Sequence, residues 1–397
     1  MRLVFGYQKS LELLTRGGFA STSIAQNRLH FFQQQEPLCL LSRKLQRKEC
    51  KGRQLCSQVR GVASMESPSG FAPALPKPVS RPAQLPNPPL AYELVQGALV
   101  RWSEQQAGQR PPPTAVMVHG ILGSRKNMQA YAHRLVEGFP AWQVLLVDIR
   151  CHGESANLPP PPGPHGVESS AQDILKLLSQ LKLFPEVLIG HSFGGKVVMS
   201  MGEQFGASGK RLPRPVQVWV LDALPGEVRT GGRETQDHPA ALIAHLQQMP
   251  MPLPNRTALQ NDLLNAGFSL TVARWASTNL RPLNGDHRKL VWALDLNGIA
   301  DMYESYETAN LWSFITSTPE GLRVSFVKAE HSTFRWAGPE QAVISSHGHA
   351  VHTLHKSGHW VHADNPDGLF QIMAPYFGAA DLHVKKPSSW PARSRTG

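Results

Sequence analysis

Ser192 lies in the stretch Gly190-His191-Ser192-Phe193-Gly194, with one glycine two residues before it and another two residues after it. This G-x-S-x-G pattern is typical of a nucleophile elbow, a sharp strand-to-helix turn that holds a serine hydroxyl clear of the backbone. Glycines are needed there because side chains would collide in so tight a turn. The pattern is short enough to occur by chance, so the rest of the chain must decide between a nucleophile and an ordinary loop serine.

A serine nucleophile needs a base that accepts its proton and a carboxylate that orients the base. In enzymes with a nucleophile elbow, the chain order is serine, acid, histidine. His359 lies in "SGHW", after the last expected strand and before the final expected helix. The elbow and the chain order together favour His359 as the base over a surface or structural histidine.

Three carboxylates compete for the role of the acid. Asp222 ends the expected strand "VWVLD", directly after the elbow unit. Asp295 lies in "VWALDLNG", and Glu330 ends "SFVKAE", the commonest place for the acid in such an arrangement. We favour Asp222 over Asp295, and both over Glu330; the alternative for each is a strand-end or helix-capping carboxylate.

Two backbone amides are needed to bind the oxyanion. The first is expected from Phe193, the residue after the nucleophile. The second is expected from the loop after "MVHG", where Ile121 or Leu122 supplies an N–H, and we take Ile121. The stretch "DIRCHGES" (148–155) is interpreted as an ion-paired loop that braces this oxyanion segment.

The elements that position these residues follow an alternating rhythm of strands and helices from Tyr92 onward. Such alternation predicts an α/β fold with a mostly parallel sheet and helices on both faces. The expected strands are 92–102 (alternating, as in antiparallel pairs), 114–120, 142–150, 186–192, 215–223, 322–330 and 350–358; the expected helices are 127–139, 170–181, 195–206 and 367–377.

The alternation of strands and helices is interrupted at 226–310 by a mostly helical insertion before the last two strands. Helices are expected there at 238–249, 270–280 and 301–312. We interpret the insertion as a lid over the site. An excursion that merely packs is the alternative. Four apolar residues are expected to line an acyl pocket in or beside the lid, namely Trp275, Leu280, Trp292 and Trp312.

The charge of the chain is uneven. Of 397 residues with a formal charge of +11, residues 1–65 hold 11 basic and three acidic side chains. This basic, acid-poor segment reads as a transit peptide, for a chloroplast or alternatively a mitochondrion. A Pro-rich linker (66–90), the main domain (91–380) and a disordered tail (381–397) follow. The body is nearly neutral, so nucleic-acid binding is not expected, and no apolar run is long enough to span a membrane.

Metal and disulfide chemistry are disfavoured. Three of the four cysteines lie in the first 65 residues and only Cys151 lies in the body, which excludes a disulfide framework or a cysteine-rich zinc site there. A histidine-rich stretch near the end is the competing metal candidate, but its spacing fits no closed site. We expect no cofactor. The six histidines are His347, His349, His352, His355, His359 and His362.

Taken together, "HGILGSRKN", "DIRCHGES", "GHSFGGKV" and "SGHWVHADNPDGL" resemble the alpha/beta-hydrolase-domain eleven-like esterases, and the organelle-targeted plant branch above all. The resemblance runs from about Tyr92 to Phe377. It implies the alpha/beta-hydrolase fold, a serine hydrolase of acyl esters or thioesters without cofactor, and a triad of Ser192, His359 and Asp222. Some members are assigned an acid in the lid, at the position that Asn297 holds here.

Two rival functions remain open from sequence. One is a binding or scaffolding protein on the same fold with a silent triad. The other is a non-hydrolytic elimination that uses the same triad. The first is disfavoured because Ser192 and His359 are both present.

Overall fold

The structure is a computed structural model that describes residues 85–100, 112–159, 163–207, 215–228, 237–332, 336 and 338–381. The predicted transit peptide, most of the predicted linker and nearly all of the predicted tail lie outside these residues. The last residues of the predicted linker are described and pack against the main domain, because Leu90 is buried and the Leu85 amide donates to the Tyr92 hydroxyl at 3.1 Å.

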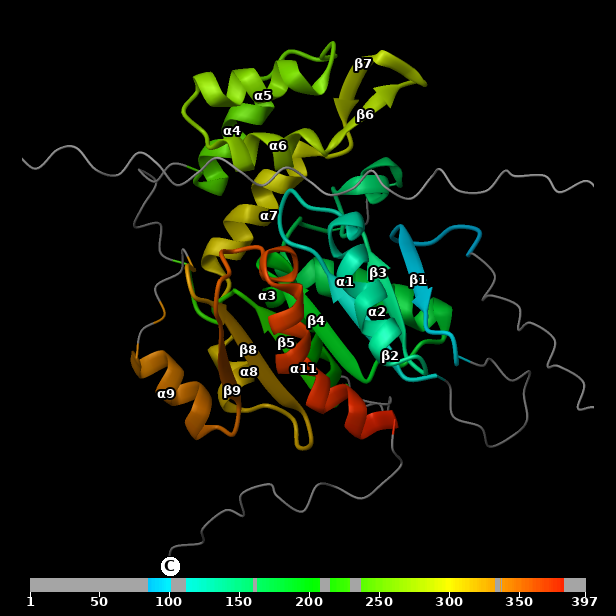
Figure 1. Cartoon of the computed structure of the whole chain (residues 1–397), viewed down its shortest axis with the longest axis vertical. Coiled ribbons are helices and arrows are strands. Elements are labelled where there is room, and N and C mark those ends of the chain that lie inside the picture. Colours follow the sequence, from blue (N-terminus) through cyan, green and yellow to red (C-terminus); the bar gives the residue numbers. More distant parts are fainter. Residues whose placement is uncertain are drawn as a thin grey trace, which may run out of the picture. The chain divides into compact units, whose positions relative to one another are not determined.

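A seven-stranded sheet in the order β1-β3-β2-β4-β5-β8-β9 forms the centre of the described chain (Figure 1). Every neighbouring pair is parallel except β1 with β3, which is antiparallel. The predicted mostly parallel sheet is therefore confirmed. The strands are β1 Tyr92–Gln96, β2 Thr114–Val118, β3 Gln143–Val147, β4 Val187–His191, β5 Gln217–Leu221, β8 Arg323–Ala329 and β9 Ala350–Leu354.

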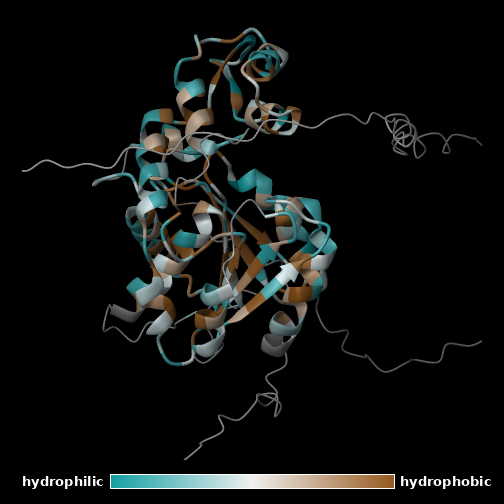
Figure 2. Ribbon diagram, turned by 90° about the vertical axis from the view of Figure 1, so that its left-hand side faces the viewer, coloured by the Kyte–Doolittle hydropathy of each residue, from teal (hydrophilic) through white to brown (hydrophobic). Residues whose placement is uncertain are grey.

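The inner strands are apolar and bury both faces of the sheet, as parallel strands require. On β2, Ala115 and Met117 join the core that contains residues of α1 (Arg125–Gly138) and α11 (Pro366–Asp381). Val116 and Val118 join the opposite core, with α2 (Val167–Leu181) and α3 (Phe193–Ala207). The predicted helices on both faces are confirmed, and hydrophobic colour gathers on the central strands in Figure 2.

The segment between β5 and β8 is largely helical, with α4 Pro239–Gln247, α5 Arg256–Asn265, α6 Leu270–Ser277 and α7 Leu296–Thr308. Figure 1 shows α4, α5 and α6 grouped with a hairpin of β6 (Leu280–Leu283) and β7 (Asp286–Trp292). The hairpin was not predicted. Its turn residues, Asn284 and Gly285, have positive φ of 50° and 83°. Asn-Gly is a strong hairpin turn signal, because both residues accept the left-handed conformation that the turn needs.

At the start of the domain, the strand prediction for 92–102 was wrong in part. Within the described residues 92–100, only β1 forms a strand, and the chain then turns, with the Val100 amide donating to the Gly97 carbonyl at 3.1 Å. The last two residues of this prediction, 101 and 102, lie outside the described residues. Four short elements also had no sequence prediction: the 3₁₀ helix η1 Gly153–Asn157 and the helices α8 Trp312–Thr316, α9 Gly338–Ser346 and α10 Val361–Asp364. Among the helices of the described residues, none combines the length and apolar character that a membrane crossing requires.

Candidate active site

Ser192 occupies a strained turn between β4 and α3. Its φ is +52°, a left-handed value that costs free energy for a residue with a Cβ and that marks functional sites. The turn depends on its glycines: a Cβ on Gly190 would overlap the Gly194 backbone, and a Cβ on Gly194 would overlap the Val118 carbonyl. The sequence therefore folds here as a nucleophile elbow, with the Ser192 side chain at the carboxyl end of the sheet.

Asp222 follows the neighbouring strand β5 and also has a positive φ, of 47°. Its side chain is fully buried. The Ala329 amide donates to one carboxylate oxygen at 3.0 Å, and the other oxygen lies 2.8 Å from His359 Nδ1. The carboxylate is thus fixed by the end of β8 and points at the histidine.

His359 lies in the loop between β9 and α10, with about a quarter of its side chain exposed. Because a carboxylate only accepts hydrogen bonds, Nδ1 carries the proton in this contact, and Nε2 is the nitrogen that can act as a base. The His359 carbonyl accepts from His191 Nε2 at 2.7 Å, and the two rings lie 4.7 Å apart. The histidine is therefore held against the residue that precedes Ser192.

The other two carboxylates have different partners. Asp295 is the N-cap of α7, and its Oδ1 accepts from the Asn297 and Gly298 amides at 3.2 Å each. Glu330 lies at the surface, where the Lys356 amide donates to it at 2.7 Å. The structure brings Asp222 to His359 and gives Asp295 and Glu330 the capping and strand-end contacts that were their alternatives.

The loop after β2 runs beside the nucleophile, since a Cβ on Gly120 would come within 3.1 Å of Ser192 Cβ. The Leu122 amide donates to His152 Nε2 at 2.9 Å. Neither the Ile121 nor the Phe193 amide donates to another group among the described residues. The sequence offered the Ile121 and Leu122 amides of this loop as donors. Because Leu122 already donates to His152, Ile121 is the amide available to an oxyanion.

Two buried histidines fix the conformation of that loop. His119 Nδ1 donates to the Gly120 carbonyl at 2.8 Å and its Nε2 accepts from the Ile149 amide at 3.2 Å. His152 Nδ1 donates to the Arg150 carbonyl at 2.8 Å. Burial lowers the pKa of both, to about 3 for His152. Both rings stay neutral, so each keeps one acceptor nitrogen for the backbone.

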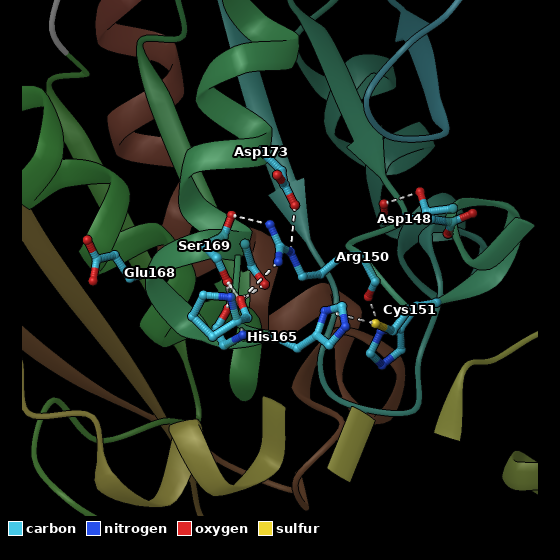
Figure 3. A network of polar contacts seen from close by, with 12 residues as sticks. Asp148, Arg150, Cys151, His165, Glu168, Ser169 and Asp173 are labelled. Atoms are coloured by element: carbon cyan, nitrogen blue, oxygen red, sulfur yellow. Dashed lines mark hydrogen bonds and ion pairs between the residues drawn. The ribbon is translucent and has the colours of Figure 1, made fainter. Parts of the chain in front are cut away.

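The stretch 148–155 braces this region as expected. Asp148 pairs with the Arg125 side chain at the start of α1. Arg150 is buried, and its Nε donates to Asp173 at 2.7 Å while its other nitrogens reach the Pro164 and Ser169 carbonyls (Figure 3). These contacts tie the loop after β3 to both α1 and α2.

Among the described residues, one further group of side chains has the spacing of metal ligands: ligand atoms of Cys151, His165 and Asp295 lie within 4.8 Å of one another. Figure 3 shows Cys151 beside His165, with Sγ and Nδ1 3.5 Å apart. Burial and the nearby Asp295 raise the pKa of the Cys151 thiol to about 12, which favours the protonated form. The Cys151 carbonyl accepts from the Asp295 amide at 2.8 Å, so the group joins the stretch 148–155 to α7.

The histidine side chains of the histidine-rich stretch contact different parts of the fold. His347 and His349 bond carbonyls of α9 and α8, His352 stacks on Trp219 at 5.8 Å, and His355 lies beside Glu330. His362 packs edge-on against His191 at 4.9 Å, and burial lowers its pKa to about 4.

The lid residues singled out from sequence lie in different places. Leu280 is buried, and Trp292 and Trp312 pack partly buried against the core. The Trp275 ring lies 5.6 Å from Trp360, the neighbour of His359. Trp275 is therefore the lid tryptophan with a ring contact beside the histidine.

Three residues near the site were missed by sequence reasoning. Lys196, one turn after Ser192, donates from Nζ to the carbonyls of Gly226, Tyr306 and Ala309 at 2.8, 2.7 and 2.8 Å. Asn279 of the lid donates to the Leu122 carbonyl at 2.7 Å. Tyr306 of α7 packs its ring 6.0 Å from Phe193. The one available signal was the lysine directly after the elbow glycines, because Lys is rare on a buried helix face.

Comparisons with known proteins identify the family and the fold of the chain. The model of a family described as the alpha/beta hydrolase family matches residues 115–372. A Mus musculus protein named sn-1-specific diacylglycerol lipase ABHD11 is 27% identical over 332 residues, 80% of this chain and 96% of that protein. Esterase YbfF of Escherichia coli is 24% identical over 264 residues, 66% of this chain and 91% of that protein. A solved structure titled "Marine microorganism esterase" aligns with a TM-score of 0.57 at 22% identity, over 72% of this chain and 98% of the other.

Proposed function

Because the chain belongs to the alpha/beta hydrolase family, as its sequence predicted, we propose that it hydrolyses carboxylic esters or thioesters of acyl groups. The proposed intermediate is an acyl-enzyme on Ser192. The observation that carries the proposal is the 2.8 Å contact between His359 Nδ1 and Asp222, beside a strained Ser192. Esterase and lipase names among the relatives support the substrate class.

In the first half-reaction, Ser192 Oγ attacks the substrate carbonyl and His359 Nε2 accepts its proton. Asp222 holds the imidazole in the required tautomer and stabilises the imidazolium that forms. The Ile121 and Phe193 amides donate to the oxyanion, an interaction that is strongest in the transition state. The tetrahedral intermediate then collapses as His359 returns the proton to the leaving group.

In the second half-reaction, water attacks the acyl-enzyme. His359 accepts a proton from this water, the same two amides bind the second oxyanion, and the proton passes to Ser192 Oγ as the acid departs. Every proton transfer uses His359 Nε2, so no further acid or base is needed in the mechanism.

The test is labelling of the full chain with a fluorophosphonate probe, with the adduct mapped by mass spectrometry. We expect modification at Ser192 that is lost in His359→Ala, together with hydrolysis of short- and long-chain acyl esters. A folded protein that neither labels nor hydrolyses would instead support the binding-protein alternative. Product analysis separates hydrolysis, which yields the free acid, from elimination.

We also propose that residues 1–65 direct the chain to a chloroplast, with a mitochondrion as the alternative. The support is the composition of that segment, with 11 basic and three acidic residues. Import of the full chain into isolated chloroplasts and mitochondria tests the two addresses, and import into neither contradicts both.

A further inference from the structure

The Tyr306 hydroxyl is a buried polar group without a hydrogen-bond partner among the described residues. The side chain belongs to lid helix α7 and the residue is only 3% exposed. Leaving such a group unpaired costs about 1–3 kcal/mol, and native proteins pair most of them. An orphaned donor of this kind beside a reactive serine indicates a ligand that is bound only during turnover.

The Tyr306 side chain is held at the site by the nucleophile helix. Lys196 Nζ lies 4.7 Å from the centre of its ring and 2.7 Å from its carbonyl oxygen, and Phe193 packs against the ring. The ring is therefore fixed by two residues of the first turn of α3. Its orientation does not depend on the hydroxyl.

The hydroxyl lies close to the reacting groups. Burial raises the pKa of Tyr306 and the nearby Asp222 charge raises it further, whereas an interaction with the Ser192 hydroxyl lowers it. The net shift is upward, so the hydroxyl remains a proton donor at any physiological pH. The two hydroxyls are neighbours, yet their geometry does not make a hydrogen bond.

The chemistry of the intermediate identifies the missing acceptor. In the proposed mechanism, the tetrahedral carbon carries the Ser192 oxygen, the acyl chain, the oxyanion and the leaving group. The Ile121 and Phe193 amides bind the oxyanion from the sheet side. The alkoxy oxygen of the leaving group is the remaining acceptor of the substrate, and the Tyr306 hydroxyl on α7 is a donor that has no partner among the described residues.

We propose that Tyr306 donates a hydrogen bond to the alkoxy oxygen of the ester leaving group, which makes it a catalytic residue supplied by the lid; the proposal rests on the proposed function. As the carbon–oxygen bond breaks, the electron pair stays on that oxygen and the proton comes from His359. Tyr306 keeps its own proton. Because a thioester sulfur is a weak acceptor, the residue selects oxygen esters over thioesters.

The experiment compares Tyr306→Phe with wild type on two substrates that have the same acyl chain and differ only in an ethoxy or ethylthio leaving group. We expect kcat/KM to fall roughly 10- to 100-fold for the oxygen ester and less than roughly threefold for the thioester. Fluorophosphonate labelling of Ser192 should be retained in Tyr306→Phe, because the nucleophile and its base are unchanged. Tyr303→Phe is the matched control, one turn earlier on α7, and should leave the ester-to-thioester ratio unchanged.

The folded state provides a second readout. Tyr306→Phe removes an unpartnered hydroxyl, so its resistance to urea should equal or exceed that of wild type. Equal losses on both substrates, complete loss of labelling, or lower stability would assign Tyr306 to positioning or packing and overturn the proposal. Failure of the wild-type chain to label or hydrolyse would overturn the proposed function itself, which keeps the two failures distinct.

Discussion

At the carboxyl end of the sheet, Asp222 and two loop histidines already have partners: Asp222 accepts from Ala329 and His359, and His119 and His152 each use both ring nitrogens. In the insertion between β5 and β8, helix α7 carries the Tyr306 hydroxyl, which has no hydrogen-bond partner among the described residues. Under the proposed function, the sheet edge is preorganised for the chemical step, and the Tyr306 hydroxyl is available to donate a hydrogen bond to the substrate. Substitutions in the two regions should therefore change different measurements.

The largest expected effect is at the sheet edge. Ser192→Ala should lower kcat by about 10⁶-fold, because the nucleophile and its proton are lost together. Hydrolysis of an activated ester and fluorophosphonate labelling measure the loss. Ser192→Gly should be equally inactive but more stable to urea than the alanine variant by about 1 kcal/mol, since φ is +52°. Full activity in either variant would remove Ser192 from the mechanism.

Asp222→Asn tests the same region through the acid. An amide nitrogen facing His359 Nδ1 forces the wrong tautomer, so kcat should fall by about 10³- to 10⁴-fold while the fold is kept. The matched control is Asp295→Asn, because asparagine caps a helix about as well as aspartate, and turnover should stay within about threefold. A larger loss in the Asp295 variant would move the acid into the lid.

Lys196→Met tests the hydrogen bonds by which Lys196 links the nucleophile helix α3 to the insertion. Three carbonyl oxygens lose their shared donor, so we expect destabilisation of about 2–4 kcal/mol in urea unfolding. Lys126→Met, at an exposed position of α1, is the control and should change stability by less than about 0.5 kcal/mol. Equal changes in unfolding free energy for the two variants would mean that the Lys196 hydrogen bonds do not stabilise the fold.

The smallest effect concerns pH. Burial lowers the folded pKa of His362 to about 4 and of His152 to about 3, from 6.5. The unfolded chain therefore binds more protons than the folded one between these values, and stability present above pH 6.5 is lost as the pH falls. His362→Phe should reduce the slope of unfolding free energy against pH by up to about 1.4 kcal/mol per unit between pH 6.5 and 4.5. An unchanged slope would contradict a neutral buried His362.

The sheet edge could be predicted from sequence because its residues follow strands of one parallel sheet, namely β4, β5 and β9. Parallel strands bring their carboxyl ends to one edge, so the expected strand ends place Ser192, Asp222 and His359 near one another. Chain order also allowed Asp295 and Glu330 as the acid, and the contacts in the structure distinguish the three carboxylates. The choice between Ile121 and Leu122 needed the structure, since it depends on which amide His152 accepts from.

The lid was predicted less well. Its contacts join residues far apart in sequence, such as Lys196 with Tyr306, and no local pattern encodes them. The hairpin of β6 and β7 was not predicted although Asn284-Gly285 forms its turn, because β7 begins with four polar residues and lacks the apolar alternation of a half-buried strand.

The three carbonyls that Lys196 binds come from both ends of the lid: Gly226 where the chain leaves the sheet, and Tyr306 and Ala309 near its return. One side chain therefore pins the entry and exit of a long insertion at a single point on the nucleophile helix. An insertion anchored in this way can gain or lose residues at its far end at little entropic cost. Changes in the length of the insertion would leave the elbow unaffected. The fold can therefore accept lids of different length and specificity without a change at Ser192.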